Sequence, residues 1–369
     1  MASASDGMNY APQGKPEPVV KPGEFQFAVA ALDHGHINGQ TNGLTEAGGT
    51  LKYVFDKLDA GKAKAFAENY GAQHVTDLDV ILNDPEVHLV AAAAIPNERA
   101  PLGIRCLDAG KHYFTDKTPL LSLEQLEKVR AAVARTGKKY MVYFSERLHV
   151  ECAMHATDMI QQGAIGRVLS VTGFGPHRMG VPSSRPDWFF KHDQYGGILC
   201  DIGSHQIEQF LTYAGCQDAE ISSSAVGNFG NPDTPELEDF GDCHLVGDNG
   251  ATMYFKVHWF TPDQLRVWGD GRTFVTGTDG YIEMRKYVDV AQPEMTSDVL
   301  ILVNADGEQR MELAGKVGYK YFGRLIRDCI DGTENAMTQT HTLKAAELCV
   351  RAQLAAKNLT PEALRRPMD

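Results

Sequence analysis

The chain has 369 residues, of which 43% are hydrophobic and 22% are charged, and its formal net charge is −13 at pH 7. This length exceeds the ~250–300 residues that one hydrophobic core usually supports, so we expect two domains. An acidic surface argues against nucleic acid and anionic membranes as partners. The seven cysteines form no CxxC pair and no long apolar run occurs, which predicts reduced thiols, no membrane span and a cytoplasmic location.

The first part of the chain has the pattern of a dinucleotide-binding domain. Residues 1–24 are small, polar and rich in Pro and Gly, which predicts a flexible N-terminal arm and not a secretory signal. Within residues 25–147, apolar strands alternate with helices, as in a Rossmann-type doubly wound parallel sheet of an α/β fold. The expected strands are 25–32, 51–55, 88–94, 111–115 and 139–144, and the expected helices start near 37 and span 59–70, 101–109 and 122–135.

The pattern changes near residue 150, which indicates a second domain over 148–369. A helix over 149–162, a strand over 167–174 and a helix over 198–214 are expected first. Strands joined by Gly- and Asp-rich turns then follow up to residue 311, which predicts an α/β domain with a large, mainly antiparallel open sheet. We expect this domain to bind substrate and to mediate self-association, with C-terminal helices within 319–358.

The turn after the first strand is the expected place for a cofactor diphosphate. Residues 33–39 read DHGHING, in which only Gly35 matches the middle glycine of the GxGxxG pattern, because Asp33 and Asn38 occupy the outer positions. Asp56 follows 21 residues after Gly35. A carboxylate there accepts hydrogen bonds from ribose hydroxyls and repels a 2′-phosphate, which favours NAD over NADP. An N-terminal helix cap or a solvated acid in a turn explains Asp56 equally well.

The same turn also allows a metal interpretation. His34 and His36 alternate beside Asp33, and two imidazoles with a carboxylate can bind a transition metal. No further group of ligands at a fixed spacing accompanies them, so we expect no metal site.

Two later segments carry chemistry. Lys117 follows a predicted strand, and the carboxyl ends of parallel strands bind ligands in this fold class. A lysine there can bind a substrate hydroxyl and stabilise a developing alkoxide. Asp201 and His205 are four residues apart, so they share one helix face, where the imidazole can act as a general base oriented by the carboxylate. An exposed lysine and a solvated helical pair are the alternatives that contain no site.

These segments together resemble the Gfo/Idh/MocA family of NAD(P)-dependent oxidoreductases, over about residues 25–358. The family's Glu-Lys-Pro motif is similar to Asp116-Lys117-Thr118-Pro119, with one inserted Thr, and its DxGxH motif is matched by Asp201, Gly203 and His205. The family's TPN segment is similar to Ile95-Pro96-Asn97, and its acidic residue after the second strand falls on Asp56. Its RF…GxIG stretch is similar to Glu146-Arg147 followed by residues 163–167.

The resemblance implies hydride transfer between nicotinamide and a secondary hydroxyl of a sugar, glycoside or cyclitol, by a homodimer or homotetramer. Lys117, Asp201 and His205 are the implied catalytic residues. The expected cofactor-binding residues are Gly35, His36, Ile37, Asp56, Pro96, Asn97, Asp116 and Arg147. The expected substrate residues are His177, Arg178, Arg185, Trp188 and Tyr195. Two other interpretations stay open: a hydrolase or lyase on the same fold with recycled NAD or a metal, and a sugar or NAD sensor without catalysis.

Overall fold

The structure is a computed structural model that describes residues 12–181 and 184–364. It divides into two compact units, which are described separately. The N-terminal unit comprises Lys15–Tyr143 and Gly318–Ala346, and the C-terminal unit consists mainly of Phe144–Val317. None of the described helices is long and apolar enough to cross a membrane.

The N-terminal unit is built on a six-stranded sheet in which every pair of neighbours is parallel. The strand order is β3-β2-β1-β4-β5-β6, the order of two mononucleotide-binding halves joined at β1 and β4. The strands are β1 (Gln26–Ala30), β2 (Thr50–Phe55), β3 (Gln73–His74), β4 (Val87–Ala92), β5 (His112–Asp116) and β6 (Tyr140–Tyr143). Both β5 and β6 are buried along their whole length, as expected for strands covered on both faces.

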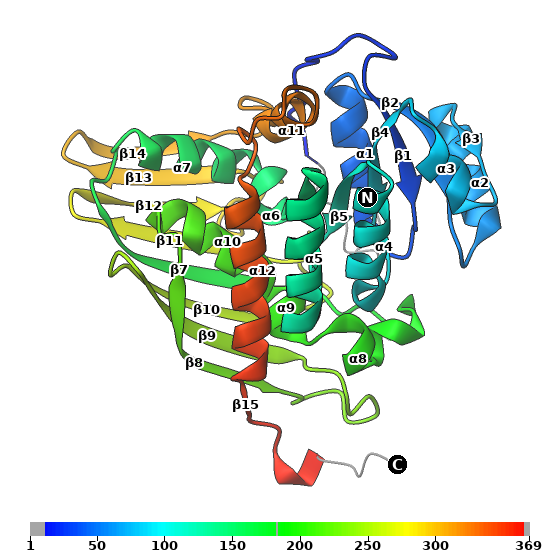
Figure 1. Ribbon diagram of the computed structural model, residues 1–369. Coiled ribbons are helices and arrows are strands. Elements are labelled where there is room, and N and C mark those ends of the chain that lie inside the picture. Colours follow the sequence, from blue (N-terminus) through cyan, green and yellow to red (C-terminus); the bar gives the residue numbers. More distant parts are fainter. Residues whose placement is uncertain (1–11, 182–183, 365–369) are drawn as a thin grey trace. The chain divides into compact units, whose positions relative to one another are not determined.

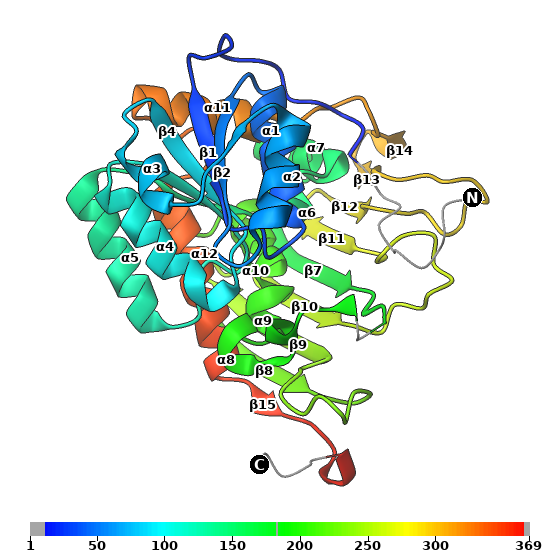
Figure 2. The ribbon, with the colours of Figure 1, turned by 90° about the vertical axis from the view of Figure 1, so that its right-hand side faces the viewer.

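Helices cover both faces of this sheet, with α1 and α2 on one side and α4 and α5 on the other (Figure 2). Local signals set their ends: Asp59 and Ser122 accept a backbone N–H at the start of α2 and α5, and Gly71 and Gly137 end these helices in the left-handed conformation. The helices are α1 (His36–Glu46), α2 (Ala60–Tyr70), α3 (Leu78–Asn83), α4 (Pro96–Asp108), α5 (Leu123–Thr136) and α11 (Lys320–Asp331).

The C-terminal unit is built on a nine-stranded open sheet with helices against one face (Figure 1). Its order is β14-β13-β12-β11-β7-β10-β9-β8-β15, and all pairs are antiparallel except β7 with β10 and β8 with β15. The predicted fold class, with a mainly antiparallel second sheet, is therefore confirmed. The strands are β7 (Val168–Pro176), β8 (Ala219–Gly227), β9 (Phe240–Gly247), β10 (Thr252–His258), β11 (Arg272–Gly277), β12 (Gly280–Arg285), β13 (Val299–Asn304), β14 (Gly307–Glu312) and β15 (Lys357–Asn358).

The other helical segments are short apart from three. They are α6 (Ser145–Leu148), α7 (Glu151–Gln161), η2 (Asp187–Phe190), α8 (His192–Tyr195), α9 (Ile198–Asp201), α10 (Gly203–Ala214), α12 (Gln339–Leu354) and η3 (Glu362–Leu364). Helix α10 packs on β7, where Gly173 and Gly175 leave room for the side chain of Gln206. Tyr254 and Tyr281 of this sheet are 41% and 44% exposed, so self-association through such side chains stays a prediction.

The domain assignment differs from the sequence-based one at both ends of the chain. Residues 318–346 belong to the N-terminal unit, because Tyr321 packs on Phe114 and Phe322 on Tyr143. Part of the expected flexible arm is also packed, since the Val19 N–H donates to the Ala47 carbonyl at 2.9 Å. The rest of the arm, residues 1–11, lies outside the described residues.

Candidate active site

The turn between β1 and α1 leaves the start of the helix open. Gly35 is the N-cap of α1, no side chain caps the helix, and a Cβ on Gly35 would meet nothing within 4 Å. The N–H groups of Ile37 and Asn38 make only long bonds of 3.3 and 3.2 Å, to the carbonyls of His34 and Gly35. Weakly engaged donors at a helix N-terminus suit a diphosphate, so this turn fits a dinucleotide in spite of its two missing glycines.

Close packing of α1 depends on two other glycines. A Cβ on Gly39 would collide with the hydroxyl of Tyr143, and a Cβ on Gly43 with the ring of Phe322. The GxGxxG pattern places its third glycine at position 38, which is Asn38 here. Gly39, one residue later, allows the close helix packing instead. The sequence contains this signal, but the GxGxxG template does not detect it.

Asp56 lies directly after β2 and is held by the backbone. Its carboxylate accepts hydrogen bonds from the N–H groups of Leu32 at 2.6 Å, Leu58 at 2.7 Å and Asp59 at 2.8 Å. The carboxylate thus caps the turn before α2, whose N-cap is Asp59, so the helix-capping interpretation of Asp56 is wrong and a role toward ribose stays a prediction. Burial raises the pKa of the nearby Asp33, and the negative charge of Asp56 raises it further. Two carboxyl groups at this place disfavour an additional phosphate.

The segment that contains Lys117 is fixed by a buried arginine. Arg99 of α4 is 1% exposed and donates to the carbonyls of Ala94 at 2.7 Å and Thr118 at 3.1 Å, and also to the carbonyl of Lys117. It contacts the Asp116 carboxylate at 3.2 Å. Arg99 thereby holds the Lys117 segment at the carboxyl end of β5. Sequence analysis missed Arg99, which lies before the helix predicted over 101–109 but inside the observed α4.

Of the expected TPN-like residues, Pro96 is the first residue of α4, a position that suits proline. The Asn97 carbonyl accepts from Gln125 Nε2 at 3.2 Å. Its buried side-chain Oδ1 has no hydrogen-bond partner among the described residues. An unsatisfied buried oxygen at the ligand-binding edge is consistent with a cofactor contact of Asn97, which stays a prediction.

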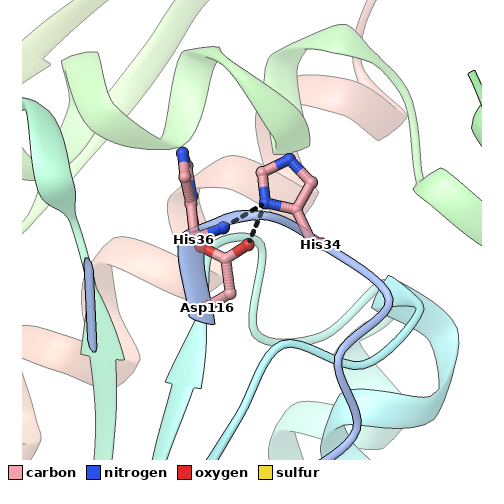
Figure 3. Close-up of side chains that lie close together, drawn as sticks. All are labelled: His34, His36 and Asp116. Atoms are coloured by element: carbon pink, nitrogen blue, oxygen red, sulfur yellow. Dashed lines mark hydrogen bonds and ion pairs between the residues drawn. The ribbon is translucent and has the colours of Figure 1, made fainter. Parts of the chain in front are cut away.

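His34, His36 and Asp116 form one cluster (Figure 3). Asp116 Oδ1 lies 2.8 Å from His36 Nδ1, and Asp116 Oδ2 lies 3.1 Å from His34 Nδ1. Each imidazole side chain is 28% exposed and the carboxylate is fully buried. Burial and, to a smaller extent, the charge of His36 lower the pKa of His34 to about 4. Burial by itself raises the pKa of Asp116, but His36, Arg99 and His34 outweigh it and hold that pKa well below its usual range.

This cluster brings together a set of possible metal ligands at the turn where the sequence predicted no metal site. The carboxylate beside the two histidines is Asp116, not Asp33, and it lies 80 residues from His36 in the chain. Among the described residues, His34, His36 and Asp116 could hold a metal ion, because their three ligand atoms lie within 4.8 Å of one another. Spacing along the sequence could not reveal this partner, since the fold supplies it.

Asp201 and His205 lie on successive helices of the C-terminal unit. Asp201 ends α9 and His205 lies in the first turn of α10, so the single predicted helix is interrupted at Ile202. Ile202 keeps helical dihedrals of −78° and −38°, so the four-residue offset still places both side chains on one face. His205 is buried, and Asp201 is close enough to Arg185 to oppose the lowering of the Arg185 pKa by burial.

The predicted substrate residues His177 and Arg185 belong to an aromatic cluster. The His177 ring packs on Trp259 and Trp268, with centroids 5.4 and 4.3 Å away. The Arg185 guanidinium lies over Phe189 at 4.8 Å and over Trp259 at 5.0 Å. Trp259 Nε1 is buried without a hydrogen-bond partner among the described residues. Sequence analysis missed Trp259 and Trp268 because they come from the end of β10 and the loop before β11, which are distant from His177 in the chain.

The other three predicted substrate residues make contacts within the protein. Arg178 is 5% exposed, and its guanidinium donates to the carbonyls of Pro262, Leu265 and Val267. The buried Tyr195 hydroxyl accepts from the Glu238 N–H at 2.9 Å. Trp188 is partly buried and packs edge-on against Phe189. For Arg178 and Tyr195 these contacts favour a structural role, and substrate contact stays an untested prediction for all three.

Arg147, predicted to bind cofactor, forms a buried ion pair in the C-terminal unit. Its Nε donates to both carboxylate oxygens of Glu208 at 2.9 Å. Next to it, Glu146 contacts Lys286 Nζ at 3.2 Å and accepts from Gln206 Nε2 at 3.0 Å. Arg147 thus stabilises α10 through Glu208, which follows the DxGxH segment in that helix. Its role toward a cofactor stays a prediction.

The fold and the matched family models define an oxidoreductase with an NAD(P)-binding Rossmann domain. Residues 34–144 match the model described as oxidoreductase family, NAD-binding Rossmann fold, and residues 153–283 match the GFO/IDH/MocA C-terminal domain. The scyllo-inositol 2-dehydrogenase (NAD(+)) of Bacillus subtilis is 30% identical over 269 residues, which cover 70% of this chain and 73% of that protein. The chain therefore belongs to the Gfo/Idh/MocA family.

Other relatives match over shorter stretches. The D-xylose dehydrogenase of Paenarthrobacter nicotinovorans is 30% identical over 152 residues, which are 39% of this chain and 38% of that protein. The match thus spans well under half of this relative.

Among solved structures, an oxidoreductase from Erwinia carotovora atroseptica SCRI1043 has 48% sequence identity and a TM-score of 0.87, and covers 91% of this chain and 100% of its own. Levoglucosan dehydrogenase with NADH and L-sorbose (TM-score 0.73, covering 90% and 97%) has 18% identity and shares the fold. A 3-ketoreductase from Actinomadura kijaniata with NADP (TM-score 0.69, covering 92% and 99%) also has 18% identity and shares the fold.

Proposed function

We propose that the protein is an NAD-dependent dehydrogenase that oxidises a secondary hydroxyl of a sugar, glycoside or cyclitol. The observation that carries this proposal is the position of Lys117, at the carboxyl end of β5 in a segment that Arg99 holds in place. In a parallel α/β sheet this edge binds the ligand. The DxGxH residues Asp201 and His205, in an ordered helical segment, supply the acid–base group that such a reaction needs.

The chain's own residues would divide the work as follows. Bound NAD supplies the hydride acceptor. His205 Nε2 or Nδ1 takes the hydroxyl proton as the carbon is oxidised, because an imidazole exchanges protons near neutral pH. The Lys117 ammonium donates to the reacting oxygen and stabilises its negative charge. Asp201 orients the imidazole and the substrate hydroxyl.

The cofactor preference rests on Asp56. Its carboxylate stands at the end of β2, where it would accept from ribose hydroxyls and repel a 2′-phosphate. Solved relatives differ, since levoglucosan dehydrogenase is seen with NADH and the 3-ketoreductase with NADP. The acidic Asp33 beside Asp56 adds to the case for NAD.

The substrate class rests on the aromatic cluster around His177 and Arg185. Aromatic rings packed edge-on, with a buried and unsatisfied Trp259 N–H, suit the apolar face and hydroxyl edge of a sugar ring. The dehydrogenase relatives for inositol and xylose are consistent with this class. We further propose a cytoplasmic homo-oligomer, a dimer or a tetramer.

The test is NADH formation with a panel of sugars, inositols and glycosides. Replacing His205 by Ala should lower turnover by roughly a hundredfold or more while NADH binding changes little, because only the proton transfer is lost. Lys117→Met should cause at least as large a loss. His155→Ala, on α7 outside these segments, is the matched control. Near-normal turnover of both variants on the best substrate would overturn the assignment.

The His34–His36–Asp116 cluster favours one second candidate, a hydrolase or lyase that uses a metal or recycles its NAD. That enzyme would convert a glycoside without net NADH formation. Product analysis on the same panel separates the two candidates.

A further inference from the structure

His34, His36 and Asp116 bring two imidazole nitrogens within 3.1 Å of the oxygens of one carboxylate. The backbone N–H of His36 points at His34 Nδ1 at 3.3 Å, and this contact requires the ring nitrogen to be an acceptor. Asp116 Oδ2 lies 3.1 Å from the same nitrogen, which requires it to be a donor. One imidazole nitrogen cannot do both at once. A cation bound to the His34 lone pair and to the carboxylate would stabilise the contact between those two groups, in place of the long contact with the His36 backbone N–H.

The distances also match a coordination shell. Ligands about 2.1 Å from a metal lie about 3.0 Å apart at right angles and about 3.4 Å apart in a tetrahedron. The two Nδ1–carboxylate distances here are 2.8 and 3.1 Å, and all three ligand atoms fall within 4.8 Å of one another.

We propose that His34, His36 and Asp116 form a binding site for one divalent transition-metal ion. Two imidazoles and one carboxylate prefer Zn²⁺, Co²⁺, Mn²⁺ or Fe²⁺ to Mg²⁺ and Ca²⁺, which take oxygen ligands. Three protein ligands leave coordination positions for oxygen atoms of a bound ligand. The site would lie at the carboxyl ends of β1 and β5, where the fold class places its ligands.

Groups behind the cluster hold the carboxylate as metal sites require. The Lys117 N–H donates to Asp116 Oδ1 at 2.8 Å and Arg99 contacts Oδ2 at 3.2 Å. Such outer contacts orient a ligating carboxylate. The Arg99 charge also repels a cation, so the ion binds on the side of the histidines and with moderate affinity.

The test is direct metal binding to the full-length protein, stripped with a chelator and kept free of NAD and substrate. Calorimetric titration with Co²⁺ and Zn²⁺ should give one site per chain. His34→Gln and His36→Gln should each raise the dissociation constant for the metal by roughly tenfold or more, since each substitution removes one ligand. His155→Gln, outside the cluster, is the matched control and should bind as the parent does.

Binding well below one ion per chain would overturn the proposal, as would unchanged affinity in both cluster variants. Equal affinity for Mg²⁺ and Co²⁺ would overturn it too, because nitrogen ligands discriminate against Mg²⁺. Circular dichroism of each variant separates loss of a ligand from loss of the fold. The readout needs no catalysis, so a failed dehydrogenase assay leaves this result intact, and the reverse also holds.

Discussion

The buried pair of Arg147 and Glu208 tests whether Arg147 is structural or binds the cofactor. The Glu208 side chain is fully buried and that of Arg147 is 8% exposed. Glu208 receives Arg147 Nε at 2.9 Å on both oxygens and Thr212 Oγ1 at 2.9 Å. Replacing Glu208 by Leu leaves a buried guanidinium without its carboxylate, which costs about 3–5 kcal/mol. A domain is stable by only about 5–15 kcal/mol, so this single variant should be close to unfolding.

The double variant Arg147→Met, Glu208→Leu separates the pair from the charge left behind. It buries two apolar side chains, so it should recover most of the loss seen with Glu208→Leu. Urea unfolding at 25 °C measures the free energy of unfolding of the parent, of Glu208→Leu and of the double variant. NADH titration of the double variant measures its cofactor affinity. We expect that affinity to stay within about threefold of the parent. A cost below about 1 kcal/mol for Glu208→Leu, or a large loss of NADH affinity in the folded double variant, would refute the structural role.

Three further perturbations follow from the structure. Asp56→Asn should narrow the difference between NADH and NADPH dissociation constants, because it removes the negative charge near the ribose; fluorescence titration with both cofactors measures this, and an unchanged ratio would contradict it. Arg99→Lys should lower turnover more than it raises KM, since lysine lacks the separate Nε and Nη1 donors that reach the Ala94 and Thr118 carbonyls; a KM effect alone would argue against a positioning role. Tyr254→Glu, on the exposed side of β10, should shift the mass measured by light scattering toward the monomer, and an unchanged mass would exclude this surface from the interface.

Long elements with a clear period could be predicted from the sequence. The continuous apolar run that became β1 and the amphipathic α5 were both expected within two residues of their observed bounds. The two-residue β3 and the six-residue α3 were missed, because so short a segment carries too few residues to show a period. The assignment of α11 to the second domain failed for another reason: its partners Phe114 and Tyr143 lie about 200 residues away in the chain.

The site shows the same division between local and distant information. Lys117 and the DxGxH residues were found because each motif is contiguous. Arg99 was missed because its importance comes from carbonyl groups in the loop after β5, which no residue identity reveals. The aromatic cluster was only half predicted, since Trp259 and Trp268 reach His177 through tertiary packing.

The departures from the family's lysine motif are physically connected. Asp116 stands where Glu is usual, and its shorter side chain contacts Arg99 and the two histidines of the β1–α1 turn. The inserted Thr118 gives its carbonyl to the same Arg99. Two changes that look independent in the sequence thus meet in one hydrogen-bonded cluster around the Lys117 backbone. Since that cluster determines where Lys117 lies, a metal ion bound by its histidines would act on the same segment that the proposed reaction uses.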